Sequence, residues 1–210
     1  QVAQVDEMSG GRVELGLGTG WYAAEHSAYG IPFPQKRFGL LEEQLEVITG
    51  SWATPIGERY SFRGEHYTLV DSPAMPKPAQ AKVPVIIGGG GPTRTPAIAA
   101  RYADEFNIGF QPEAVLAEKI GGVKAAAERL GRDPQSLKYS VALTTFAADN
   151  ERELLRRGAE ANRSPEQTRS DANIWGDAEQ ITEKVKRLAA LGAQRVYFQL
   201  LNLRDLEQLE

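Results

Sequence analysis

The residues with the clearest capacity for chemistry lie between Val83 and Asn107. A β-branched apolar run ends in four consecutive glycines, Gly88 to Gly91, and an alanine-rich segment follows Pro92. A second apolar run at 105–110 completes a pattern of strand, glycine turn, helix and strand. Glycines let the backbone approach a ligand closely, and a helix start presents N–H groups at the positive end of its dipole. This pattern predicts an anion-binding site, and phosphate is the commonest ligand of such sites.

Two well-known phosphate motifs do not account for this glycine turn. A Walker A loop ends in Gly-Lys-Ser/Thr, whereas here the chain continues with Pro92, Thr93 and Arg94. A Rossmann fingerprint needs a third glycine where Thr93 stands, and Asp104 lies too close to serve as its ribose-binding acid. The alternative is a glycine turn without any ligand, because such turns are common in loops. The turn by itself leaves both interpretations open.

A second glycine turn, 18–20, is followed by side chains that could contact a substrate. Trp21 and Tyr22 could line an apolar pocket. His26 is a candidate acid–base group, because imidazole exchanges protons near neutral pH, and Glu25 is a candidate hydrogen-bonding partner for a cofactor or substrate. The structural alternatives are a loop histidine for His26 and a carboxylate at a helix N-terminus for Glu25.

Five predicted strands that alternate with helices must position these residues. They are 12–18, 83–88, 105–110, 138–147 and 195–201. Such alternation indicates parallel strands joined by right-handed crossovers, with active sites at the carboxyl ends of the strands. The residues after Phe146 and Gln199 are therefore expected on the same face as the two glycine turns. Both a doubly wound sheet and a (β/α)8 barrel fit this order.

The start of the sequence favours the barrel. Val2, Val5 and Met8 are spaced as in the last turns of an amphipathic helix, and Gly10 and Gly11 follow as its stop. A domain rarely begins with the end of a helix, so we expect a fragment of a longer protein. Because five strands cannot close an eight-stranded barrel, the prediction is an α/β TIM barrel with three further strands upstream.

A long connection separates the first two predicted strands. It opens with a helix whose apolar face consists of Phe38, Leu41, Leu45 and Ile48. Gly50 is expected to stop this helix. Residues 52–82 then hold a predicted hairpin at 60–69 and several prolines that keep the chain extended. Connections of this length often cover active sites. Further along, residues 158–173 are polar and predict no defined element.

Composition excludes several classes of function. The 210 residues carry a net charge of −4 without a Lys/Arg cluster, which argues against a nucleic-acid surface. There is no cysteine and there are only two histidines, so neither a disulfide nor a metal site is expected. No apolar run approaches membrane-spanning length and no signal-peptide pattern opens the chain, which predicts a cytoplasmic protein without membrane contacts.

The order and spacing of five motifs carry a family resemblance. They are SGGRVELGLGTGWY at 9–22 with Glu25 shortly after, Arg37 with LEE at 41–43, SPAMPKP at 72–78, IIGGGG at 86–91 and AARYADEFN at 99–107. Together they span essentially the whole chain. They resemble the luciferase-like monooxygenase superfamily, most closely its deazaflavin (coenzyme F420)-dependent oxidoreductases.

The resemblance implies a TIM barrel of which residues 1–210 supply strands four to eight within a single domain, with 52–82 as an insertion segment. It implies hydride transfer between coenzyme F420 and a small organic substrate, with an FMN-dependent monooxygenase as the alternative. It also allows a homodimer. The cofactor-binding residues implied in this way are Gly18, Gly20, Gly88, Gly89, Gly90 and Asn107.

One position departs from the family pattern. In a sugar-phosphate dehydrogenase branch, the residue after the 18–20 turn is a glutamate proposed as proton donor, whereas this chain has Trp21. This departure argues against sugar-phosphate oxidation and keeps a non-catalytic flavin-binding barrel open. A nicotinamide-binding Rossmann enzyme is the third hypothesis. Apolar strand edges at 13–17 and 196–201 further predict that the 210-residue piece alone is poorly soluble.

Overall fold

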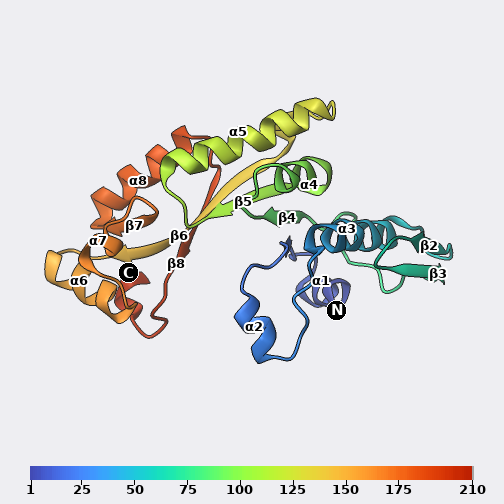
Figure 1. The fold of residues 1–210 in the computed structure, drawn as a ribbon, viewed down its shortest axis with the longest axis horizontal. Helices are drawn as coiled ribbons and strands as arrows, with labels where there is room; N and C mark the ends of the chain where they lie inside the picture. Colours follow the sequence, from blue (N-terminus) through green and yellow to red (C-terminus); the bar gives the residue numbers. More distant parts are fainter. Residues whose placement is uncertain (210) are drawn as a thin grey trace. The chain divides into compact units, whose positions relative to one another are not determined.

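Parallel strand pairing, as expected from the sequence, is present in both parts of the chain. The computed structural model describes residues 1–209, and the chain divides into two compact units, Gln1–Ile87 and Gly88–Glu210 (Figure 1). Each unit contains strands that run in the same direction, so the α/β class predicted from the alternation of elements is confirmed.

The first unit combines a parallel strand pair with a helix and a hairpin. Its elements are α1 (Val2–Ser9), β1 (Leu15–Leu17), α2 (Ala23–Ala28), α3 (Arg37–Ala53), β2 (Tyr60–Arg63), β3 (Thr68–Ser72) and β4 (Val85–Gly88). β1 pairs with β4, and Leu17 lies opposite Ile87. α1 ends at Ser9, and its C-cap residue Gly10 has φ 69°, the left-handed conformation expected of a helix stop.

A buried carboxylate fastens the end of α1 to the segments that follow it. Asp6 is fully buried and accepts hydrogen bonds from the backbone N of Val13 (3.2 Å) and from the backbone N (2.9 Å) and Nε2 (2.8 Å) of Gln80. Burial alone would raise the pKa of Asp6, but these hydrogen bonds outweigh it and hold the pKa below its usual 3.8. The ionised carboxylate thus joins three segments of this unit.

The expectation that Gly50 stops the helix was wrong, because α3 continues to Ala53. The ring of Tyr60 on β2 explains the glycine. A Cβ atom added to Gly50 would lie 2.6 Å from Cε2 of Tyr60, and the Tyr60 hydroxyl donates a hydrogen bond to the carbonyl oxygen of Glu46 (3.1 Å). Gly50 therefore allows the hairpin to approach the helix and does not terminate it.

The predicted hairpin is confirmed within the connection 52–82. β2 and β3 are antiparallel, and Phe62 lies opposite Leu69. The Glu43 carboxylate on α3 accepts hydrogen bonds from the three backbone N–H groups of residues 65–67, at 2.7–2.9 Å. The turn of the hairpin is thereby tied to α3, and the connection has a defined structure of its own.

The second unit is built around β6 (Lys138–Ala147). β5 (Glu105–Gly109), β7 (Asn173–Gly176) and β8 (Arg195–Gln199) all pair with it in parallel. The helices are α4 (Arg94–Tyr102), α5 (Glu113–Arg129), α6 (Glu151–Glu160), α7 (Pro165–Thr168) and α8 (Ala178–Ala190), with 3-10 turns at Pro134–Ser136 and Leu206–Leu209. α5 packs on α4 and β5, and α8 packs on β6 and β7 (Figure 1). Buried apolar side chains include Phe106, Ile108, Leu116, Val123, Leu143, Ile174 and Leu188.

All five predicted strands form, and β7 is an addition. It lies at the end of the polar stretch 158–173, which also holds α7, and its residues pair with the carboxyl half of β6. Within residues 1–209 the strands form no closed barrel. None of the helices in this described range has both the length and the apolar composition that a membrane crossing requires.

A buried ammonium group connects three segments of the second unit. Lys184 on α8 is 4% exposed, and its Nζ donates to the carbonyl oxygen of Asp171 (2.6 Å) and to its Oδ1 (2.8 Å). Nζ also lies 2.8 Å from Oε1 of Glu113, the first residue of α5, while Oδ2 of Asp171 accepts from the Glu113 backbone N (2.9 Å). These bonds link α5, the turn before β7 and α8.

Candidate cofactor and substrate site

The glycine turn after β4 is shaped by β5. Gly89 has φ 136°, a conformation that L side chains rarely adopt, and its N–H donates to the carbonyl oxygen of Asn107 on β5 (3.4 Å). The side chain of Asn107 donates from Nδ2 to Oγ of the buried Ser140 on β6 (2.9 Å). The structure therefore brings the predicted residues Gly89 and Asn107 together, with Asn107 acting as a support for the turn.

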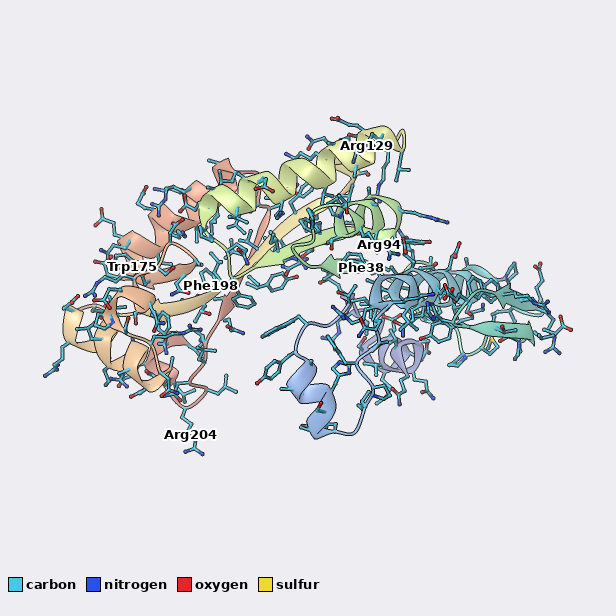
Figure 2. The ribbon with its side chains drawn as sticks, viewed as in Figure 1. Phe38, Arg94, Arg129, Trp175, Phe198 and Arg204 are labelled. Atoms are coloured by element: carbon cyan, nitrogen blue, oxygen red, sulfur yellow. The ribbon has the colours of Figure 1, made fainter. Side chains whose placement is uncertain are left out.

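The next residue, Gly90, borders open space. Gly90 is exposed, and a Cβ atom added to it would meet no atom within 4 Å. α4 begins close by, and the side chain of its N-cap residue Thr93 makes no capping hydrogen bond. Within the described chain, the first turn of α4 carries no acidic residue, and exposed Arg94 opens it (Figure 2). An open glycine backbone beside a helix start and a cationic side chain fits a phosphate group.

The turn after β1 is followed by two exposed aromatic rings. Gly20 has φ 70°, and Trp21 and Tyr22 are 84% and 53% exposed, with ring centroids 5.2 Å apart. α2 starts directly afterwards, and the exposed Glu25 lies in its first turn. That position matches the structural alternative for Glu25, a carboxylate that interacts with the helix dipole.

His26 lies at the centre of a small cluster formed by α2 and the loop behind it. Its Nδ1 lies 3.1 Å from the carbonyl oxygen of Pro32, and its ring packs edge-on against Phe33 at 4.9 Å between centroids. The guanidinium of Arg37 lies 4.2 Å from the centroid of Phe33. A Cβ atom on Gly20 would lie 3.7 Å from Nε2 of His26, so the imidazole faces the glycine turn.

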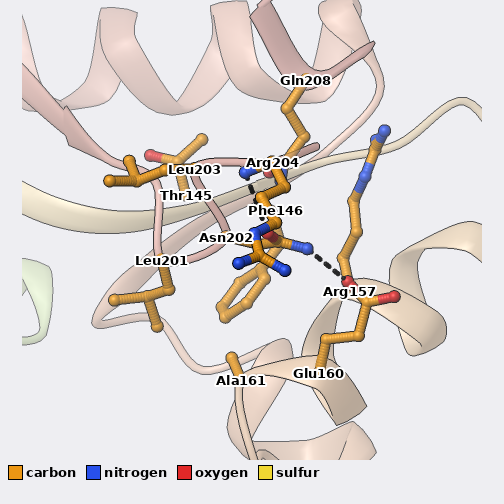
Figure 3. A pocket seen from close by; sticks show the side chains of 10 residues that line it. All are labelled: Thr145, Phe146, Arg157, Glu160, Ala161, Leu201, Asn202, Leu203, Arg204 and Gln208. Atoms are coloured by element: carbon orange, nitrogen blue, oxygen red, sulfur yellow. Dashed lines mark hydrogen bonds between the residues drawn. The ribbon is translucent and has the colours of Figure 1, made fainter. Parts of the chain in front are cut away.

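A cavity of about 510 Å³ lies where β6 and β8 end (Figure 3). Its lining is Thr145, Phe146, Arg157, Glu160, Ala161, Leu201, Asn202, Leu203, Arg204 and Gln208. Phe146, near the end of β6, and residues 201–204, which follow β8, thus meet at this cavity. Metal-ligating side chains form no group of three or more in residues 1–209.

Buried Arg157 stabilises one wall of this cavity. Its Nε donates to Oδ2 of Asp205 (2.8 Å), its Nη2 donates to Oδ1 of Asp205 (3.2 Å), and its Nη1 donates to the carbonyl oxygen of Ala147. The hydrogen bond with Arg157 holds the pKa of Asp205 below its usual value. Sequence reasoning missed this pair, since no local pattern links α6 to residues 48 positions later.

Comparison with known proteins identifies the family. Residues 1–162 match the family model described as luciferase-like monooxygenase. The chain belongs to the luciferase-like monooxygenase family. Its relatives include the FMNH2-dependent dimethylsulfone monooxygenase of Pseudomonas putida, at 30% identity over 73% of this chain and 41% of that protein. Another is the pyrimidine monooxygenase RutA of Escherichia coli strain K12, at 32% identity over 62% of this chain and 35% of that protein.

Solved structures of luciferase-like enzymes share the fold of this chain. An F420-dependent secondary alcohol dehydrogenase superposes with a TM-score of 0.79 at 20% identity, over 94% of this chain and 66% of that chain. The EDTA monooxygenase EmoA from Chelativorans sp. BNC1 gives 0.77 at 17% identity, over 99% and 66%. The predicted luciferase-like α/β fold is confirmed. This chain spans 41% and 35% of the length of these two curated relatives. Both are named as monooxygenases, and the first is named as FMNH2-dependent. The solved structures with this fold include F420-dependent enzymes.

Proposed function

We propose that the whole protein is a luciferase-like oxidoreductase whose cofactor carries a ribityl phosphate. The phosphate would lie against the turn Gly88–Gly90 and the start of α4. The observation that carries this proposal is the open space at Gly90 beside an N-cap residue whose side chain makes no capping bond. Gly89 and Asn107 would hold the turn in shape, and the backbone at Gly88 and Gly90 would face the anion.

Reduced FMN is the first candidate for this cofactor, and coenzyme F420 is the second. The family resemblance of the sequence motifs favours F420. A curated relative at 30% identity favours FMN, because it is named as FMNH2-dependent. Likeness to F420-dependent structures at 20% identity or below supports the fold only. When bound, either cofactor supplies two-electron hydride chemistry, and reduced FMN additionally activates oxygen.

The remaining roles follow from the family resemblance. Gly18 and Gly20 are proposed to lie against the cofactor ring, and Trp21 and Tyr22 to contact a small organic substrate. Residues 1–210 would belong to one barrel domain with 52–82 as its insertion, and the protein would form a homodimer. The chain's own task is to bind, orient and exclude water around the reacting groups.

A titration of the full-length protein with FMN and with F420, each oxidised and reduced, tests the proposal. Gly90→Leu should fill the open space and weaken binding of the preferred cofactor by about tenfold or more, ~1.4 kcal/mol. Gly121→Leu on α5 is the matched control, because a Cβ atom there also meets nothing within 4 Å. Absence of binding by either cofactor, or equal affinity of the two leucine variants, would contradict the proposed site.

A further inference from the structure

The imidazole of His26 is held in one tautomer. Its Nδ1 lies 3.1 Å from the carbonyl oxygen of Pro32. A carbonyl oxygen can only accept a hydrogen bond, so Nδ1 carries the hydrogen and Nε2 of the neutral ring carries the lone pair. Because the hydrogen bond to Pro32 keeps the hydrogen on Nδ1, Nε2 is the nitrogen that can accept a proton.

The ring is also fixed in orientation. Phe33 packs against it at 67° between ring planes, and Arg37 covers the ring of Phe33. Edge-on aromatic packing and a cation over a ring each restrict the ring to one orientation. The orientation of the His26 ring is therefore set by the protein before any ligand binds. A histidine without a function in a surface loop would not need such a fixed orientation.

Nε2 lies beside the turn after β1. A Cβ atom on Gly20 would lie 3.7 Å from Nε2, so the glycine leaves that side of the imidazole without a neighbouring side chain. The two exposed aromatic rings of Trp21 and Tyr22 come next in the chain. The carboxyl end of a parallel strand is where ligands bind in α/β folds, and exposed aromatic surface marks a contact site.

We propose that His26 is a catalytic base whose Nε2 takes the proton of a substrate O–H or N–H group. The substrate is a small planar ring compound that stacks on Trp21 or Tyr22. The O–H or N–H bond breaks, its electron pair stays on the substrate, and the proton forms a bond to Nε2 to give an imidazolium. This assignment rests on the proposed oxidoreductase function, for which it names the proton acceptor and the substrate class.

The test compares wild type, His26→Ala and His66→Ala in the full-length protein. His66 is the other histidine of these 210 residues and lies in the hairpin turn held by Glu43. Turnover of uracil, a planar ring that carries N–H groups, is measured with oxidised F420 and with reduced FMN plus dioxygen. Dimethyl sulfone, which has neither a ring nor an O–H or N–H proton, should be turned over equally by wild type and His26→Ala, and an equal loss with both probes would overturn the assignment. His26→Ala should lower turnover of uracil by about 100-fold or more, and added imidazole should restore part of it. His66→Ala should keep wild-type turnover, and the affinity for the cofactor should be unchanged in both variants.

Equal turnover of the two alanine variants would overturn the assignment. It would also be overturned if His26→Ala lost turnover together with cofactor affinity and added imidazole restored none of the turnover. Nitrogen-15 NMR of the histidine-labelled full-length protein needs neither cofactor nor substrate. The spectrum is recorded at a pH where the ring is neutral. Hydrogen on Nδ1 of His26 then supports the assignment, and hydrogen on Nε2 in place of Nδ1 overturns it whatever the probe substrates show. Absence of FMN and F420 binding with hydrogen on Nδ1 would contradict the cofactor proposal alone, so the two failures are distinguishable.

Discussion

Neighbouring glycines in the turn after β4 are glycine for different physical reasons. Gly89 has a backbone conformation that a side chain would strain, and it is held there by Asn107. Gly90 has no such restriction from the chain, and the space where its side chain would lie is open. In the proposed site, a side chain at Gly90 would therefore meet the cofactor and not the protein, whereas a side chain at Gly89 would strain the turn itself.

The buried Asp6 carboxylate should make stability fall in acid. Its pKa is lower in the folded state, so its contribution is complete above the ordinary carboxyl pKa and is lost as the pH falls through the folded value. Asp6→Asn should lower the urea midpoint at neutral pH and reduce the change in midpoint between pH 7 and about pH 3. Glu7→Gln, at an exposed position of the same helix, is the control. An unaltered pH dependence in Asp6→Asn would contradict this prediction.

Sequence reasoning predicted the glycine turn at 88–91 from the strand and helix pattern, because glycine and β-branched residues are strong local signals. Asn107 was a candidate through the family resemblance, and the structure places its carbonyl oxygen beside the N–H of Gly89. The orientation of His26 could not be predicted, because it depends on the loop at Pro32 and Phe33 returning towards α2. Nothing in the local sequence specifies such a return.

At the scale of elements, the contact between α3 and the hairpin is set by one missing side chain. Gly50→Ala should improve helix propensity by about 1 kcal/mol, yet overpacking against Tyr60 should cost about 1–3 kcal/mol, so the net effect is destabilising. In a Tyr60→Ala background the same substitution should become neutral or stabilising. Chemical denaturation of the four proteins of this double-mutant cycle measures the coupling, and additive effects would contradict the contact.

The same contact shows where element prediction failed. A glycine near the end of an apolar helix face usually ends the helix. Here the helix continues past Gly50, and the glycine is needed because the ring of Tyr60 packs against it. β7 was missed because it is short and follows a polar stretch, and its pairing with the end of β6 is what makes it a strand. The longer strands and helices were predictable because their apolar periodicity is itself the consequence of burial.

On the scale of the whole molecule, β8 presents an unpaired edge. Within residues 1–209 it pairs only with β6, and its Tyr197 is exposed. Phe198 beside it is also exposed (Figure 2). A polypeptide of these 210 residues alone should therefore self-associate, and Phe198→Lys should reduce that association. Sedimentation velocity over a concentration series measures it. A monomer at all concentrations would contradict the prediction.

The bonds of Lys184 also make this side chain a reporter of chemical accessibility. Its amine is enclosed by Asp171 and Glu113, whereas the side chain of Lys186 on the same helix is 66% exposed. An amine-reactive ester should acylate Lys186 within the first minutes and reach Lys184 only when α8 separates from its neighbours. The ratio of the two acylated peptides over time, read by mass spectrometry, would thus measure how often this helix opens in the native protein.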